Sequence, residues 1–303
     1  DSDVRVEAIN SLNEIGVKNK TVIKSLAVAL GDEFKVKLYA QQALNKLAPD
    51  FPLASVLIEA IDNKDPLVRI RVVKILSEIE NKKKSIQALA KVAIEDENNK
   101  VLQAVFKSIK DLGVDKLDWA GVNKQKIIKK LNSVLKTDNI ELKATAIRTL
   151  GEIGIEQEEY LDDLILALGD ENNTIGYAAR EVLKKITDKE QMISILIRMS
   201  RNQGETVRLK VVRALGRIDM GNKVQKVVPS LLETINNNND EVGQEAIKTL
   251  VKIKSRERKT ISALYNTVKD NTRQIEMRKL AAISLGEMGE KSVPELVKLI
   301  KTV

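Results

Sequence analysis

The stretch DPLVRIRVVKILSEI, residues 65–79, places its apolar residues at the spacing of one helix face. Val68, Val72 and Leu76 are four residues apart, and Ile79 follows three residues later. This spacing matches the 3.6-residue turn of an α-helix, so the stretch predicts an amphipathic helix with one buried face.

The same apolar face occurs nine times along the chain. The first residue of each copy, called the anchor here, is Val4, Val36, Val68, Val101, Leu142, Ile175, Val207, Val242 or Met277. Successive anchors are 32–35 residues apart, except for one step of 41 residues from Val101 to Leu142. A near-constant step of this length indicates a repeat architecture.

A second apolar helix is predicted between successive copies, as in TVIKSLAVAL (21–30) and SIQALAKVAI (85–94). We call this the A helix and the helix with the anchor the B helix. The turns from A to B are rich in acids and amides, as in GDEF (31–34), DNKDP (62–66) and EDENN (95–99). Asp and Asn accept hydrogen bonds from the free N–H groups of a helix start, so these turns predict capped B helices.

One pair of helices cannot bury its own apolar faces, so neighbouring pairs must stack into a continuous core. We therefore predict an all-α fold, a right-handed α-solenoid (an armadillo/HEAT-like superhelix) of about nine two-helix repeats. Only 5 of the 303 residues are Pro and only 3% are aromatic, which suits packed helices. Several B helices end in Gly, the residue favoured after a helix C-terminus: Gly16, Gly113, Gly154 and Gly289.

Residues 114–126 account for the step of 41 residues, and we interpret them as an enlarged connection from a B helix to the next A helix. This segment carries the single tryptophan, Trp119. We expect Trp119 to cover exposed core at an irregular joint. A specialised binding loop is the alternative.

Composition excludes several kinds of chemistry. The chain has no Cys and no His, which removes disulfides, thiolate metal sites, cysteine nucleophiles and the usual acid–base group. We find no paired carboxylates in a predicted pocket, so we expect no enzyme activity, no cofactor and no metal. No stretch approaches 18 uninterrupted apolar residues, so no transmembrane segment is expected. The lack of Cys does not fix the cellular compartment.

The pattern D-x-x-V-R-x-x-A-x-x-x-L-x-x-I-G resembles the HEAT-repeat family, especially short bacterial HEAT-like repeats of the phycobilisome-lyase type. It is carried by residues 65–79, 141–154, 206–218 and 277–289, and looser copies cover the chain. In the family an arginine after the anchor ties neighbouring turns together through an acidic residue. The arginine positions here are Arg5, Arg69, Arg208 and Arg278, with Asp1 and Asp65 at the matching acid position. The arginine is missing at Leu102, Gly176 and Gly243.

The resemblance also implies that the B helices line the concave face of the solenoid. The residue six positions after the anchor points away from the core there, and it is basic in five of nine repeats. Together with neighbouring positions, these residues predict a basic ridge that is strongest around residues 207–252. The basic ridge consists of Lys74, Lys107, Arg148, Lys210, Arg213, Arg217, Lys248 and Lys252.

The formal net charge of +8 permits an acidic partner without requiring one. Our leading hypothesis is a non-enzymatic scaffold that binds a protein partner, with an acidic segment favoured, along the basic ridge. The alternative is a nucleic-acid-binding protein that uses the same ridge, although the few aromatic residues do not follow it. A ridge that serves only solubility is the third interpretation.

The two ends of the sequence also carry an expectation. DSDVRVEAINSLNEIG (1–16) reads as a B helix without its A helix, and SVPELVKLIKTV (292–303) reads as an A helix without its B helix. We therefore expect the array to be part of a longer chain, since terminal repeats normally carry polar caps.

Overall fold

A computed structural model describes residues 1–49, 53–79, 83–154, 158–201, 204–237 and 239–301. These residues form nineteen α-helices and two short 3-10 helices, with no strand among them. The chain divides into two compact units, unit 1 (Asp1–Ile155) and unit 2 (Glu156–Val303), and each is described by itself. The prediction of an all-α solenoid is confirmed.

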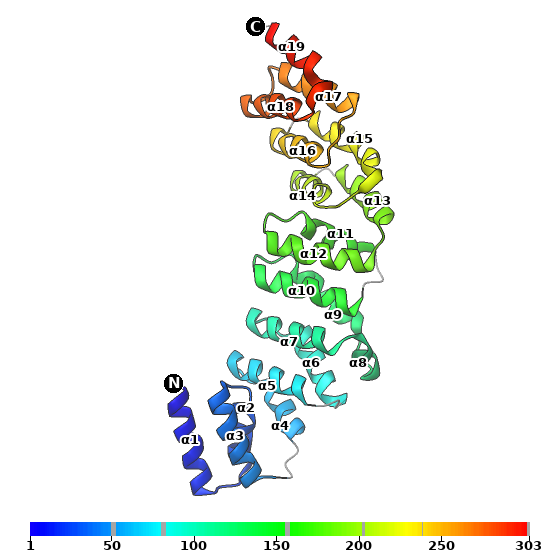
Figure 1. Cartoon of the computed structure of the whole chain (residues 1–303). Helices are drawn as coiled ribbons and strands as arrows, with labels where there is room; N and C mark the ends of the chain where they lie inside the picture. The colour runs from blue at the N-terminus through cyan, green and yellow to red at the C-terminus, as the bar shows by residue number, and fades with distance from the viewer. Residues whose placement is uncertain (50–52, 80–82, 155–157, 202–203, 238, 302–303) are drawn as a thin grey trace. The chain divides into compact units, whose positions relative to one another are not determined.

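Unit 1 contains five B helices: α1 (Ser2–Ile15), α3 (Phe34–Leu47), α5 (Pro66–Glu78), α7 (Asn99–Leu112) and α10 (Ile140–Ile153). Its A helices are α2 (Lys20–Ala29), α4 (Leu53–Ala60), α6 (Lys83–Glu95) and α9 (Lys124–Val134). Within this unit α5 packs on α7, and α7 packs on α10, so the B helices form one layer (Figure 1). The A helices form the second layer, with α2 on α4, α4 on α6 and α6 on α9.

Unit 2 repeats this arrangement. Its B helices are α12 (Asn173–Ile186), α14 (Glu205–Leu215), α16 (Asp240–Lys252) and α18 (Ile275–Glu287). Its A helices are α11 (Glu158–Leu168), α13 (Lys189–Ser200), α15 (Val224–Ile235), α17 (Arg258–Lys269) and α19 (Val293–Lys301). The 3-10 turns η1 (Gly221–Lys223) and η2 (Gly289–Ser292) precede α15 and α19. Each A helix from α13 to α17 packs on the B helix that follows it.

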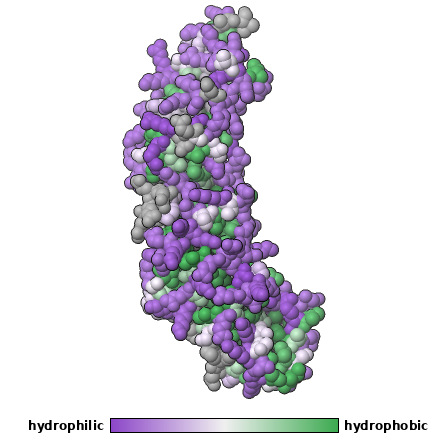
Figure 2. Space-filling view, turned by 180° about the vertical axis from the view of Figure 1, so that it is seen from behind, coloured by the Kyte–Doolittle hydropathy of each residue, from purple (hydrophilic) through white to green (hydrophobic). Residues whose placement is uncertain are grey.

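The anchor face forms the core in most repeats, as the periodicity predicts. In α16, Val242, Ala246 and Leu250 are all buried. The first repeat differs, because Val4 is 67% exposed and Ile15 is 68% exposed. No described helix covers this face of α1, which buries Val6 and Ile9 instead. Figure 2 shows a mainly hydrophilic surface, with hydrophobic surface gathered at the end that carries the first helices.

Side-chain caps start most B helices, as the acidic and amide turns predict. The Asn98 side chain accepts hydrogen bonds from the backbone N–H groups of Lys100 and Val101. Asn139 caps α10 in the same way, through the backbone N–H of Leu142 at 2.9 Å. These bonds satisfy donors that have no partner inside the helix, which fixes where each B helix begins.

The segment 114–126 contains a further short helix, α8 (Val114–Trp119). Leu117 and Ala120 are fully buried, and the Gln87 side chain donates a 2.8 Å hydrogen bond to the carbonyl of Ala120. Trp119 is 55% exposed. Leu117 and Ala120 are thus the side chains of this segment that lie in the core. The expectation that Trp119 covers core stays a prediction.

One close approach of helices in unit 2 requires glycine. Gly169, directly after α11, faces the backbone carbonyl of Lys210 in α14, and a Cβ there would overlap that carbonyl. Because the opposing atom belongs to the backbone, it cannot move aside as a flexible side chain would. This contact fixes the position of α14, which carries part of the basic ridge.

Candidate functional site

Arginines that follow the anchors join neighbouring repeats in unit 1. Nε of Arg5 lies 2.7 Å from Oδ2 of Asp32, and Arg71 reaches the same carboxylate at 2.8 Å. Arg69 binds Asp96 in a bidentate manner at 2.7 and 3.1 Å, and this hydrogen bond raises the pKa of the Arg69 guanidinium. The carboxylates are nearly buried, with 5% of the Asp32 side chain exposed. These arginines therefore stabilise the stack.

The acid partners differ from those that the family pattern implied. Asp1 and Asp65 accept hydrogen bonds from the backbone N–H groups of Asp3 and Leu67, so each caps its own helix. The partners of Arg5 and Arg69 lie instead in the next turn from an A helix to a B helix. That assignment was wrong because capping a helix start already occupies the acids at the matching position.

In unit 2 the missing family arginines are replaced by arginines from later positions. Nη1 of Arg217 donates to the backbone carbonyls of Leu168 and Asp170, both at 2.6 Å, and lies where a side chain at Gly176 would be. Arg273 donates in the same way to the carbonyls of Asn237 at 2.6 Å and Ile235 at 3.2 Å. Both arginines satisfy carbonyls at or just beyond the C-terminal end of an A helix.

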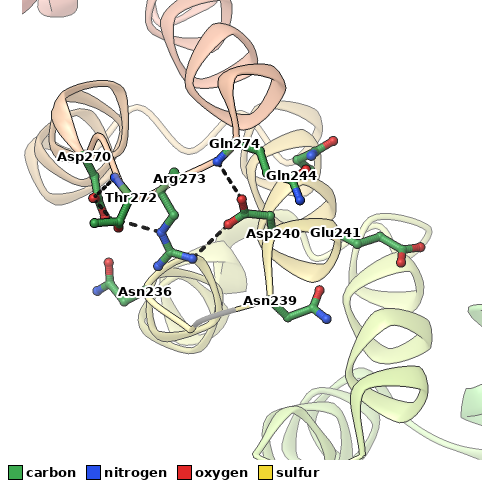
Figure 3. Close-up of a pocket in the computed structure, with 9 residues that line it drawn as sticks. All are labelled: Asn236, Asn239, Asp240, Glu241, Gln244, Asp270, Thr272, Arg273 and Gln274. Carbon is green, nitrogen blue, oxygen red and sulfur yellow. Dashed lines mark hydrogen bonds and ion pairs between the residues drawn. The ribbon is translucent and has the colours of Figure 1, made fainter.

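A hollow in unit 2 surrounds Arg273 and has a volume of about 1050 Å³ (Figure 3). Arg273 pairs with Asp240 at 3.0 Å and with Asp270 at 3.4 Å, and the Gln274 backbone N–H donates to Asp240 at 2.8 Å. The charges at its centre are thus used to join α16 to α18. Asn236, Asn239 and Glu241 point outward from this cluster in Figure 3.

Three of the predicted ridge residues, Lys74, Lys107 and Arg148, lie in unit 1 on α5, α7 and α10. All three are exposed, and none pairs with a residue in the described part of the chain. Each is followed four residues later by an acid, namely Glu78, Asp111 or Glu152. Residues four apart are neighbours on a helix surface, so the acids offset this part of the ridge.

The ridge of unit 2 has a different pattern. Arg213, Arg217, Lys248 and Lys252 line one hollow of about 370 Å³ on α14 and α16, together with Glu171 and Glu245. Here a cation is followed four residues later by a second cation, within α16 and from α14 into the turn after it. The structure therefore brings four of the eight predicted residues together. Lys210 lies outside this hollow, 3.7 Å from Asp170.

The cations of this hollow, called the ridge hollow below, are only partly neutralised. Arg213 pairs with Glu171 at 2.9 Å, while Lys248 is 3.8 Å from Glu245. Lys252 pairs with no residue that the structure describes. Burial, and secondly the neighbouring Arg213 cation, lower the pKa of Arg217. A guanidinium stays charged in proteins, so Arg213 and Arg217 both remain cations although they repel each other. Their two charges give the ridge hollow a positive potential.

The sequence reasoning did not include two cations next to the ridge hollow. Arg180 on α12 and Lys254 after α16 line an adjoining hollow of about 480 Å³ that shares Arg217 and Lys252 with it. Lys254 had a usable signal, because it stands twelve residues after its anchor, where four other repeats have glycine. Arg180 had none, since its position is not basic in the neighbouring repeats.

In the described ranges, no helix is long and apolar enough to cross a membrane. The same residues contain no group of three or more Asp or Glu side chains placed to hold a metal ion.

The stacked two-helix units define a repeat protein of the α-solenoid class. The family model for HEAT repeats matches residues 128–216 and 198–275. Residues 128–275 of the chain thus consist of HEAT repeats. Its narrower likeness to phycobilisome-lyase repeats stays a prediction. No curated protein matches the chain by sequence.

Solved structures show the same fold. A chain of the structure of Kap95p with RanGDP has a TM-score of 0.53 at 13% identity, over 89% of this chain and 40% of that one. Kap121p bound to the extreme C-terminus of the phosphatase Cdc14p gives 0.52 at 13% identity, over 93% and 39%. Kap121p bound to the SUMO protease Ulp1p gives 0.51 at 12% identity, over 100% and 41%. The chain spans about two-fifths of these karyopherin chains.

Proposed function

We propose that this chain is a non-enzymatic scaffold that binds a protein partner through an acidic segment on the ridge of unit 2. The observation that carries the proposal is the ridge hollow, where Arg213, Arg217, Lys248 and Lys252 come together from α14, the turn after it, and α16. A solenoid offers a long continuous surface of this kind, and function depends on the residues placed on it.

The spacing of the ridge suits an extended peptide. Lys248 and Arg213 occupy the same register position on α16 and α14, which pack side by side. Packed helices are about 8–10 Å apart, and an extended chain rises about 3.3 Å per residue. An acid at every third residue of an extended segment would therefore meet one repeat after another.

The solved neighbours support the same class of partner. Kap121p is a solenoid of this fold that binds the extreme C-terminus of another protein. The proposal for this chain rests on its own charges, since the identity is 13%.

A protein segment is favoured over a nucleic acid because of the side chains present. None of the residues that line the ridge hollow is aromatic. Single-stranded nucleic acids are usually held by stacking on aromatic side chains in addition to phosphate contacts. The lack of aromatic residues thus argues against a single-stranded nucleic acid, and the experiment below includes an oligonucleotide to test this alternative.

The test is fluorescence anisotropy with the labelled peptide (ESG)4, its uncharged counterpart (QSG)4 and the oligonucleotide dT12. The variant Lys248→Glu/Lys252→Glu is compared with Lys259→Glu/Lys291→Glu, which makes the same charge change at exposed sites of unit 2 outside the ridge. Arg217 is left intact because it stabilises the stack.

We expect (ESG)4 to bind the wild-type chain and to lose at least tenfold in affinity in the ridge variant. The control variant should lose less than about twofold, since Lys259 and Lys291 do not line the ridge hollow and salt screens the attraction between exposed charges. Equal losses in the two variants would refute the ridge as the site. Tighter binding of dT12 than of (ESG)4, lost in the ridge variant, would favour the nucleic-acid alternative.

A further inference from the structure

Three hollows of unit 2 follow one another around the turn that joins α14 to α15. The ridge hollow shares Gly216, Arg217 and Lys252 with a hollow at this turn. The turn hollow in turn shares Arg180, Ile218 and Asp219 with a third hollow between α12 and α13. Because neighbouring hollows share lining residues, we treat the three as one surface, called the unit 2 groove.

The third hollow differs from the others because its lining surface is mainly apolar. Leu168, Leu183 and Met192 line it and are almost fully buried, and Ile218 lines it as well. Its volume of about 420 Å³ lies in the range of sites that take a ligand group. We call it the apolar hollow. An aliphatic side chain placed there would leave water for an apolar environment.

The groove as a whole is strongly basic. Eight of its lining residues are cations and three are acids. Arg180, Lys252 and Lys254 pair with no residue in the described ranges, so their charge is available to a partner. Two of these three cations, Lys252 and Lys254, come from the end of α16, while Arg180 stands at the apolar hollow.

The backbone of Lys254 supports a role for its side chain. Its φ of 55° lies in the left-handed region, which a residue with a side chain adopts at a cost in free energy. Gly16, Gly113, Gly154 and Gly289 occupy the same register position in other repeats, with φ of 74–87°. Glycine would adopt this conformation at a lower cost, but it would remove a cation from the groove. Residues with a strained backbone often cluster at binding sites, and Lys254 fits this pattern.

We propose that the unit 2 groove binds an acidic protein segment that carries one aliphatic side chain. The aliphatic group sits in the apolar hollow, and the flanking carboxylates pair with Arg180, Lys252 and Lys254. This inference rests on the proposed function and adds to it a preference for segments with an aliphatic side chain. An acidic segment without an aliphatic residue would bind through the ridge alone.

The test compares two labelled peptides, ESELESEGE and ESESESEGE, which differ only by leucine or serine at the fourth position. We expect the leucine peptide to bind the wild-type chain about tenfold more tightly, which is the order expected for burying most of one leucine side chain. Equal affinities, with ridge dependence retained, would refute the apolar anchor and leave the proposed function standing. Lack of binding by both peptides would contradict the proposed function itself.

The variant Ile218→Ser should reduce the preference for leucine from about tenfold to about twofold without weakening the serine peptide. The matched control is Ile283→Ser, because Ile283 is 62% exposed on α18 and lies outside the groove. The Ile283→Ser variant should keep a preference for leucine of about tenfold. Loss of the preference in both variants would refute the apolar hollow as the site that binds the leucine side chain.

A second variant tests the cations of the unit 2 groove independently of the apolar hollow. Lys254→Gly relieves the left-handed backbone and removes one cation, so it should fold well and bind both peptides about threefold more weakly. An unchanged affinity for both peptides would remove Lys254 from the groove.

Discussion

The guanidinium of Arg217 occupies the space beside Gly176 that a side chain there would need. The arginine comes from the end of one repeat and the glycine from the previous B helix. At Gly176 the family pattern would have an arginine, which would project from α12 itself. Here the guanidinium arrives from the next repeat and satisfies the carbonyls of Leu168 and Asp170. An arginine thus still joins neighbouring repeats, but it comes from the turn after α14 instead of from α12.

Adding a methyl group at different glycines should therefore have different effects on stability. Gly169→Ala would press on the backbone of Lys210 and should lower the free energy of unfolding by about 3 kcal/mol. Gly176→Ala would displace the flexible end of Arg217 and should cost about 1 kcal/mol, because lost hydrogen bonds outweigh the gain in helix propensity.

The control is Gly286→Ala on α18, where a Cβ would meet no atom within 4 Å. This change should raise the free energy of unfolding by up to about 1 kcal/mol. Urea denaturation of the three variants measures their free energies of unfolding and so tests the expected order of stability. A Gly169→Ala variant as stable as Gly286→Ala would show that α11 and α14 are not in close contact.

The repeat and its caps were predictable from sequence because they depend on spacing within one helix. Val242, Ala246 and Leu250 are four residues apart, so they share one helix face. This spacing reveals the face in the sequence and also lets it be buried as a whole. The exposed anchor face of α1 was not predictable from this pattern, because burial also needs a neighbouring helix.

The candidate site was predictable only in part. Lys248 and Lys252 share a helix face, so their proximity follows from their spacing. The pairing of Arg5 with Asp32 depends on which turn of the next repeat lies beside α1. The contribution of Arg180 likewise depends on how the turn after α14 passes over α12. Such relations between repeats are set by packing, and no local pattern encodes them.

Asp32 should be important for the stability of unit 1. Its carboxylate receives Arg5 and Arg71 from two different helices, and only 5% of it is exposed. Asp32→Asn leaves both guanidinium groups without their anion and should cost about 2 kcal/mol in urea denaturation. Glu78→Gln, which removes the exposed pair with Lys37, should cost less than about 0.5 kcal/mol. Similar costs for the two variants would contradict the role of Asp32.

Glu190 should make the stability of unit 2 depend on acid pH. Hydrogen bonds from Lys223 and Lys226 lower the pKa of Glu190 from 4.5 to about 2. Its contribution is therefore fully present above about pH 4.5 and is lost as the pH falls towards 2.

Thermal unfolding between pH 7 and pH 2 measures this effect. Glu190→Gln should lower Tm at pH 7, and its difference from the wild type should shrink as the pH approaches 2. Glu287→Gln, at an exposed position of α18, should leave the pH profile unchanged. A constant difference at every pH would show that the carboxylate charge of Glu190 is not involved.

Lys254 should lower stability through its backbone. The Ser255 backbone N–H donates to the Leu250 carbonyl at 3.0 Å, a bond that closes the end of α16 and holds Lys254 at a positive φ. Lys254→Gly should raise the free energy of unfolding by about 1 kcal/mol, because glycine adopts this conformation without strain. Lys252→Gly, within the helix, should instead lower it by up to about 1 kcal/mol. Both variants lose one groove cation, so urea denaturation separates the backbone effect from the charge effect. A destabilised Lys254→Gly variant would show that the lysine side chain stabilises the fold more than its backbone strains it.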